Sequence, residues 1–141
     1  MDKIVSLGME KNELRIGNIL KSGKSYYRVY ALSYPMILAI QNVRYDVESE
    51  QGIFSSDSTI LEPITLTEEI LLKCGFEYED LADESPFEIY KKDAIEMWEF
   101  NGEYWLCDML DQNGIDHEFK YLHQLQNLYF ALTGQELQFK P

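Results

Sequence analysis

The chain has 141 residues, of which 45% are hydrophobic and 13% aromatic, and it carries a formal net charge of −13 at pH 7. This apolar content is too high for a disordered chain, and no apolar run approaches the roughly 20 residues that a membrane-spanning helix requires. The negative charge argues against binding to nucleic-acid phosphates, because such binding uses clustered lysine and arginine side chains.

The N-terminal half is predicted to form β structure. Apolar and polar residues alternate from residue 14 to 18, Ser22-Gly23 supplies a turn, and a second strand follows over residues 26–32. The apolar run 36–41 has the length of a strand and follows Pro35, which cannot donate a ladder hydrogen bond. Shorter strands are expected near residues 45–47, 52–54 and 59–62. Four or five short strands at this spacing predict a small SH3-like β-barrel.

A short helix is predicted over residues 65–75. Thr65 and Glu68 fit a capping box, with Thr67 as an alternative N-cap, and acidic residues in the first turn suit the helix dipole. Gly75 stands where a left-handed residue ends a helix. We therefore expect a helix that links two parts of the chain.

An acidic stretch follows this helix. Five carboxylates, and then Glu88, occur without a basic residue among them. Like charges at this spacing repel one another, so the pattern predicts an extended, solvated connector. The five residues form a candidate acidic patch: Glu77, Glu79, Asp80, Asp83 and Glu84.

The clearest local signal is Asn101-Gly102 between two aromatic segments. A two-residue type I′ turn needs a positive φ at both central residues, and Asn-Gly is the preferred pair. Such a turn sets the hairpin register and places Trp98 opposite Trp105. Both tryptophans then share one face with Glu96, Phe100, Glu103 and Cys107. A third strand is expected just before the hairpin, over residues 87–91.

One long helix is predicted over residues 116–133, with Asp116 as its N-cap and Gly134 as its stop. Its main apolar stripe comprises Tyr121, Leu122, Leu125, Leu128, Tyr129 and Leu132. A second stripe, about 100° away around the helix, comprises Phe119, His123, Gln126 and Phe130. A helix that is apolar on two sides either lies between two packed elements or keeps one face for a partner.

Four residues of this helix form a candidate interaction surface: His123, Gln126, Asn127 and Phe130. Packing alone does not require polar residue types at these positions. Two roles are open. The polar side chains either hydrogen-bond a neighbouring sheet or loop and lock the helix between two sub-domains, or they present a recognition surface to a partner.

The motifs of catalysis and cofactor binding are missing from the sequence. Cys107, His117 and His123 lack the spacing of a zinc site, and residues 111–114 lack the first and last ligands of a calcium loop. There is no nucleophile elbow and no glycine-rich phosphate loop. Cys74 and Cys107 are expected to be buried thiols. We therefore expect no catalytic residues, no metal and no cofactor in a protein that is not an enzyme.

Three segments carry a resemblance to a known family: residues 12–18, 63–76 and 121–137. Together they resemble a family of uncharacterised small proteins from gut anaerobic bacteria and their phages or mobile elements. That family has no assigned function. The resemblance therefore implies a mobile-element context and nothing catalytic.

The negative charge is concentrated in one part of the chain. Residues 76–118 hold fourteen acidic residues and only two basic ones, Lys91 and Lys92, and account for twelve of the thirteen net negative charges. A local field of this sign favours a basic partner. We therefore interpret the chain as a non-enzymatic interaction or accessory protein of phage or mobile-element origin. Its expected partner is a protein, not nucleic acid or a membrane. Residues 1–10 show no secretion signal, so a cytoplasmic location is expected.

Two alternatives stay open. The charged block 76–118 would suit an acidic DNA mimic that inhibits a nucleic-acid-binding host protein. The tyrosine-rich strand 26–32, with Lys21, Lys24 and Arg28, would suit a nucleic-acid-binding β-barrel, because tyrosine rings stack on bases. The identity of the partner and the oligomeric state do not follow from the sequence.

Taken together, these elements predict an α+β protein. A small N-terminal SH3-like β-barrel over residues 1–64 is followed by a linking helix over 65–76. A β-hairpin or three-stranded sheet, packed by a C-terminal helix, then occupies residues 77–141.

Overall fold

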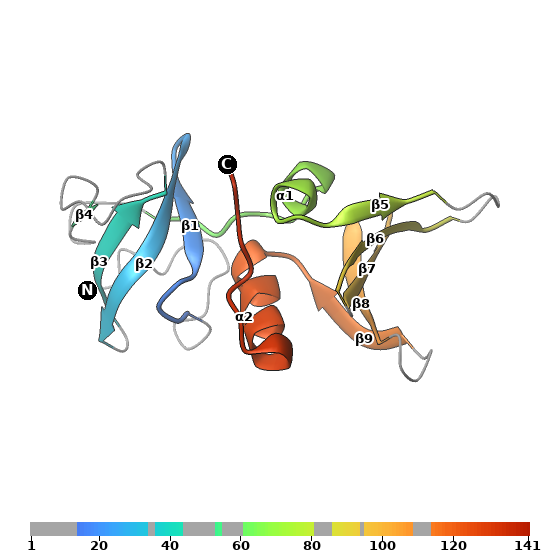
Figure 1. Cartoon of the computed structure of the whole chain (residues 1–141). Coiled ribbons are helices and arrows are strands. Elements are labelled where there is room, and N and C mark those ends of the chain that lie inside the picture. Colours follow the sequence, from blue (N-terminus) through green and yellow to red (C-terminus); the bar gives the residue numbers. More distant parts are fainter. Residues whose placement is uncertain are drawn as a thin grey trace.

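The computed structural model describes residues 14–33, 36–43, 53–54, 61–80, 86–93, 95–108 and 114–141. These residues form an α+β structure with two antiparallel sheets and two helices, which confirms the predicted class. The helices lie between the two sheets, and the C-terminal segment runs alongside the longer helix (Figure 1).

The N-terminal sheet has the strand order β1-β2-β3-β4. Its strands are β1 (Ile19–Ser22), β2 (Ser25–Ser33), β3 (Met36–Asn42) and β4 (Ile53–Phe54). In the described part of the chain this sheet is open, so the predicted SH3-like barrel is not confirmed. At the outer edge of β1, the Lys21 amide donates to the Glu62 carbonyl at 2.9 Å and the Glu62 amide donates to the Lys21 carbonyl at 2.8 Å. Among the described strands, β4 pairs only with β3. The strand expected over 45–47 lies outside the described residues.

The chain before β1 differs from the alternating strand that was predicted there. Residues 14–18 form a turn, in which the Arg15 amide donates to the Asn18 side chain at 2.8 Å and the Asn18 amide donates to the Arg15 carbonyl at 3.1 Å. Gly17 has φ +101°, a conformation that favours glycine. A side chain that hydrogen-bonds the backbone three residues earlier therefore overrides the two-residue alternation here.

The linking helix α1 (Glu68–Lys73) is shorter than predicted and uses the alternative N-cap, Thr67. The Thr67 hydroxyl accepts from the Ile70 amide at 3.2 Å. Gly75, with φ +89°, ends the helix, and the Phe76 amide donates back to the Leu71 carbonyl at 3.0 Å. The predicted glycine stop is therefore confirmed.

The C-terminal sheet has five strands instead of the predicted three, in the order β5-β6-β7-β8-β9. They are β5 (Glu77–Glu79), β6 (Glu88–Lys92), β7 (Ile95–Phe100), β8 (Glu103–Asp108) and β9 (Gly114–Phe119). The start of the acidic stretch is thus an edge strand and not a solvated connector. Charge repulsion does not prevent this pairing, because Glu77 lies opposite Lys91.

The hairpin between β7 and β8 has the predicted turn and register. Asn101 has φ +53° and Gly102 has φ +83°, and Trp98 pairs with Trp105. Local turn chemistry therefore sets the alignment of these two strands.

The long helix α2 (Leu122–Thr133) begins six residues later than predicted. Residues 114–119 pair with β8 as strand β9, so Asp116 is not the N-cap. The Gln124 side chain instead accepts from the amides of Lys120 and Tyr121, at 3.0 and 3.1 Å. Gly134 ends the helix with φ +73°, as predicted.

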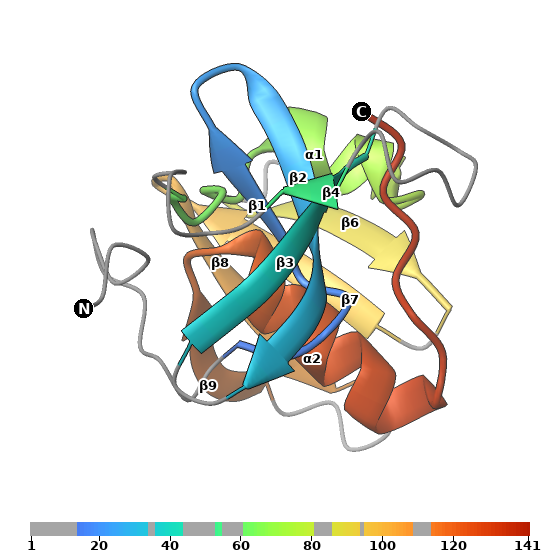
Figure 2. The ribbon, with the colours of Figure 1, turned by 90° about the vertical axis from the view of Figure 1, so that its left-hand side faces the viewer.

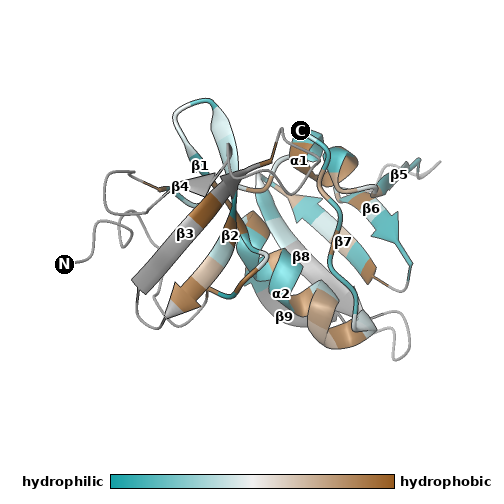
Figure 3. Ribbon diagram, turned by 60° about the vertical axis from the view of Figure 1, so that its left-hand side comes forward, coloured by the Kyte–Doolittle hydropathy of each residue, from teal (hydrophilic) through white to brown (hydrophobic). Residues whose placement is uncertain are grey.

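The helix α2 is buried on two sides, in agreement with its two apolar stripes. The main core cluster combines residues of α1, α2, the C-terminal sheet, the C-terminal tail and Ile19 of β1. A smaller cluster of Leu20, Val29, Ile40 and Leu61 lies within the N-terminal part. The end of α2 is exposed, and Leu132, predicted to be in the core, is 61% exposed. Figures 2 and 3 show α2 between the sheets, with polar and apolar residues mixed along it.

Candidate interaction surface

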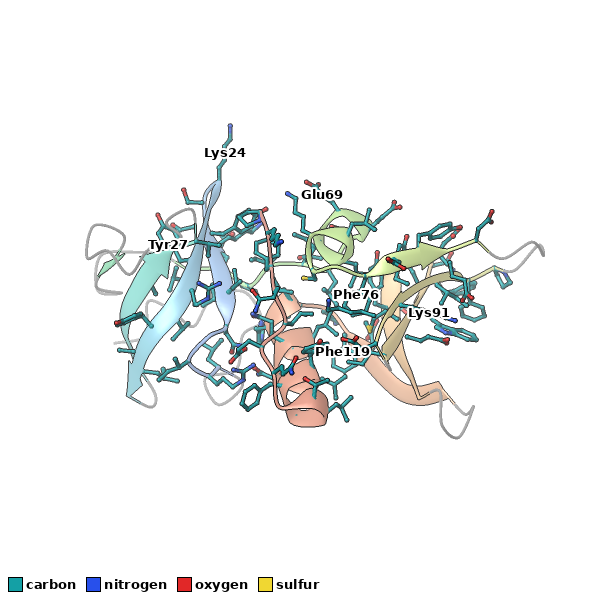
Figure 4. All side chains as sticks on the ribbon, viewed as in Figure 1. Lys24, Tyr27, Glu69, Phe76, Lys91 and Phe119 are labelled. Atoms are coloured by element: carbon teal, nitrogen blue, oxygen red, sulfur yellow. The ribbon has the colours of Figure 1, made fainter. Side chains whose placement is uncertain are left out.

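The C-terminal sheet has one face toward the helices and one face away from them. Tyr90, Met97 and Tyr104 belong to the main core cluster together with residues of both helices. Because side chains alternate along a strand, the intervening residues point to the opposite face, which we call the outer face. Among those whose side chains are described, it comprises Glu77, Glu79, Ile89, Lys91, Glu96, Trp98, Phe100, Glu103 and Glu118. In Figure 4, Lys91 lies on the side of the sheet opposite to Phe76 and Phe119.

Three aromatic rings lie side by side on this outer face. The ring of Phe87 is 5.1 Å from that of Trp98 and 5.2 Å from that of Phe100, measured between centroids. Phe100 is 37% exposed. Ile89 is buried but belongs to neither core cluster, so neighbouring side chains on the outer face cover it. We call Phe87, Trp98 and Phe100 the aromatic row.

Carboxylates surround the aromatic row. The Trp98 indole N–H donates to Glu96 at 2.8 Å, and the Lys91 ammonium lies 3.1 Å from Glu79 and 3.4 Å from Glu96. The hydrogen bond to Glu79 raises the pKa of Lys91, so this lysine stays charged. The outer face thus holds five glutamates and one lysine on its described strand positions, a net charge of −4.

Two of the four predicted surface residues on α2 are buried and act within the molecule. Gln126 is 1% exposed; its side chain accepts from the Ile19 amide at 2.8 Å and donates to the Gly17 carbonyl at 3.2 Å. His123 is fully buried and stacks on Tyr121 at 5.7 Å. These two side chains do not reach the surface of the structure. Gln126 instead has the other role that the sequence left open, which is to lock α2 against the N-terminal sheet.

The other two predicted residues lie beside the hydrogen bonds that Gln126 makes with the N-terminal part. Asn127 is half-buried and accepts a 2.7 Å hydrogen bond from Asn18. Phe130 is 42% exposed, and the Arg15 guanidinium lies over its ring, 4.6 Å from the centroid. The four residues therefore do not share one exposed surface.

Several contacts hold the Arg15 side chain beside α2. Its two terminal nitrogens donate to the Glu136 carboxylate at 2.5 and 3.0 Å, and one of them also donates to the Gln126 carbonyl at 3.1 Å. With Phe130 on its flat side, the guanidinium lies between a phenyl ring and a carboxylate. A Cβ atom at Gly17 would lie 3.0 Å from Glu136, so this close approach suits glycine.

The predicted acidic patch is divided by the structure. Glu77 and Glu79 belong to β5 and point to the outer face, and Asp80 is exposed directly after that strand. Asp83 and Glu84 lie outside the described residues.

The tyrosines of β2 do not form the stacking platform that a nucleic-acid-binding barrel would need. Tyr26 packs edge-on against Phe139 at 5.1 Å, and Tyr27 packs against the smaller core cluster. Of the three tyrosines in this strand, Tyr30 alone is largely exposed, at 50%. The described part of β2 therefore offers one exposed ring instead of a row.

The described residues contain no cluster of three or more histidine, cysteine or carboxylate side chains that could hold a metal ion. Cys74 is buried, and this burial raises the pKa of its thiol to about 12. A thiol with such a pKa is a poor nucleophile near neutral pH.

Within the same described residues, no helix has both the length and the apolar character needed to cross a membrane.

Comparisons of the chain with protein-family models, with curated proteins and with solved structures found no match.

Sequence reasoning identified part of the outer face. The Asn-Gly register placed Trp98, Phe100, Glu96 and Glu103 together. Phe87 was missed as a member, because it precedes β6 and joins the row through the β6–β7 pairing. The pairing of Arg15 with Glu136 had no local signal, since 121 residues separate them.

Proposed function

We propose that this chain is a non-enzymatic protein-interaction module that binds a basic partner through the outer face of its C-terminal sheet. The observation that carries the proposal is the combination of the aromatic row with five carboxylates on one sheet face, which no other described helix or strand covers (Figure 1). The resemblance noted in the sequence supports an accessory role in a phage or mobile element.

Aromatic and charged groups contribute to binding in different ways. Aromatic side chains supply most of the apolar contact energy at protein interfaces. Complementary charge speeds the encounter and selects basic partners over acidic ones. The outer face provides both, with the Glu96 carboxylate held in place by Trp98 and Lys91.

The aromatic row separates this proposal from the DNA-mimic alternative. A mimic of the DNA backbone needs carboxylates spread over its surface in place of phosphates. On the outer face the carboxylates instead flank a half-buried apolar centre, which is the arrangement of a protein interface with a polar rim.

The test is a display selection in which the full chain captures peptides from a randomised library. We expect enrichment of lysine- and arginine-containing sequences. Replacing three outer-face carboxylates, Glu96→Gln, Glu103→Gln and Glu118→Gln, should weaken binding of the selected peptides roughly tenfold, because each charge contact at a protein surface contributes about 0.2–1 kcal/mol.

The matched control is a second triple variant with the same change in net charge, Glu62→Gln, Glu68→Gln and Glu69→Gln, located outside the outer face. It should bind the peptides like the parent. If both triple variants lose affinity equally, attraction is general and not a property of this face. If the selection yields no basic preference, the proposed function is wrong.

A further inference from the structure

We infer that Phe100 and Glu103 form a seat for an arginine side chain of the basic partner, with Trp98 extending that seat along β7 and Phe87 packed beside both rings. This inference rests on the proposed function and names the chemistry of the group that the outer face receives.

An arginine of this chain already occupies a site made of a phenyl ring and a carboxylate. At Arg15, a guanidinium lies 4.6 Å above the Phe130 ring, and Glu136 accepts two hydrogen bonds from its terminal nitrogens. A phenyl face together with a carboxylate edge matches the flat, forked shape of a guanidinium.

Phe100 and Glu103 present the same two groups at the tip of the hairpin. They are directly opposed across the β7–β8 register, next to the two-residue turn, and both are exposed. Opposed residues in an antiparallel pair have Cβ atoms about 4.5–5.5 Å apart, so one guanidinium reaches both. Among the residues that the structure describes, no basic side chain forms an ion pair with Glu103.

The geometry of the row favours an extended occupant. Trp98 and Phe100 are two residues apart on one strand, a separation of roughly 7 Å, which equals the spacing of alternate side chains in an extended peptide. The net charge of −4 on the outer face selects a positively charged segment. The inferred occupant is therefore an extended segment with arginine at alternate positions.

The experiment is an NMR titration of the ¹⁵N-labelled full chain with three nine-residue peptides that carry arginine, lysine or citrulline at alternate positions, with glycine and serine between. We expect the arginine peptide to bind about threefold or more tightly than the lysine peptide, since guanidinium stacks on aromatic faces better than ammonium. Amide shifts should concentrate in β7, the turn and β8. The citrulline peptide, which keeps the planar shape without charge, should not bind.

Two variants separate the inferred seat from general attraction. Phe100→Leu keeps an apolar side chain but removes the ring, so it should lower arginine-peptide affinity to that of the lysine peptide. Glu103→Gln should weaken both charged peptides. Tyr30→Leu, which removes an exposed ring on the other sheet, is the matched control and should change neither affinity.

The outcomes distinguish the seat from the proposed function. Equal binding of the arginine and lysine peptides, or no effect of Phe100→Leu, overturns the seat. In that case the proposed function still holds if the Glu96, Glu103 and Glu118 triple variant weakens both peptides. If that variant also binds both like the parent, the seat and the proposed function are both wrong.

Discussion

Cys74 shows how burial alone changes the chemistry of a residue. The thiol lies in the main core cluster, is 1% exposed, and has a pKa near 12 because water cannot solvate its anion there. The nearby Lys92 opposes this effect but is the smaller influence. The residue therefore acts as a small apolar side chain at neutral pH.

This shift predicts that stability falls as the solution becomes alkaline. A cysteine in the unfolded chain has a pKa of about 8.5, so above that pH the unfolded state binds fewer protons than the folded state and gains stability relative to it. Between pH 7 and 10 we expect a loss of about 1–2 kcal/mol from this residue. Urea unfolding in a Cys107→Ser parent should show the loss, and adding Cys74→Ala should make the dependence of stability on pH less steep. Parallel slopes in the two proteins would contradict the assignment.

The hairpin of β7 and β8 is the element whose shape depends most on two residues. Asn101 and Gly102 both have positive φ, and the space around a Cβ at Gly102 is open. A side chain at this position would therefore destabilise the protein through its backbone conformation and not through contacts with neighbouring atoms. The turn also places Phe100 opposite Glu103 on the outer face.

Replacing Gly102 by alanine should therefore destabilise the protein by about 1–2 kcal/mol, the cost of a left-handed conformation for an L-residue. Gly102→Asn should cost less, because asparagine tolerates this region better. Asn101→Gly is the control and should be close to neutral in thermal unfolding. Equal midpoints for the alanine variant and its parent would show that the turn does not hold this conformation in solution.

At the scale of the whole molecule, α2 joins the two sheets. Its apolar side packs with the C-terminal sheet, and Tyr129 donates to Asp93 in the β6–β7 turn at 2.6 Å. Its polar side holds the N-terminal part through Gln126, Asn127 and the carbonyl that accepts from Arg15. The C-terminal tail adds a second connection, since Phe139 packs edge-on against Tyr26 of β2 and the Lys140 amide donates to the Lys73 carbonyl of α1 at 3.0 Å.

Removing the Gln126 amide should uncouple the two sheets. Gln126→Leu leaves the Ile19 amide and the Gly17 carbonyl without this partner, at a cost of roughly 2–4 kcal/mol. The exposed Gln138 provides the control variant, Gln138→Leu, which should be neutral. Because Trp98 and Trp105 are both in the C-terminal sheet, tryptophan fluorescence reports on that sheet, whereas circular dichroism reports on the whole chain.

In urea, the two signals should coincide for the parent and separate for Gln126→Leu, with the fluorescence transition at the higher urea concentration. Coincident transitions and an unchanged midpoint in the variant would show that Gln126 does not couple the sheets.

By itself, the sequence determined the features whose causes are local. These are the α+β class, the Asn-Gly turn with its register, and the glycine stops at Gly75 and Gly134. Each of these features depends either on the φ preference of one or two residues or on the periodicity of apolar side chains. Both can be recognised from a few neighbouring residues in the sequence.

Only the tertiary structure decided which segments meet. Strands β5 and β9 depend on pairing with β6 and β8, and the turn before β1 depends on a hydrogen bond from the Arg15 amide to the Asn18 side chain; sequence periodicity shows none of these partners. The same reason explains why Gln126 holds α2 against the N-terminal sheet and is not part of an exposed surface. A buried amide and an exposed one have the same sequence pattern, and only the approach of Gly17 and Ile19 to α2 distinguishes them.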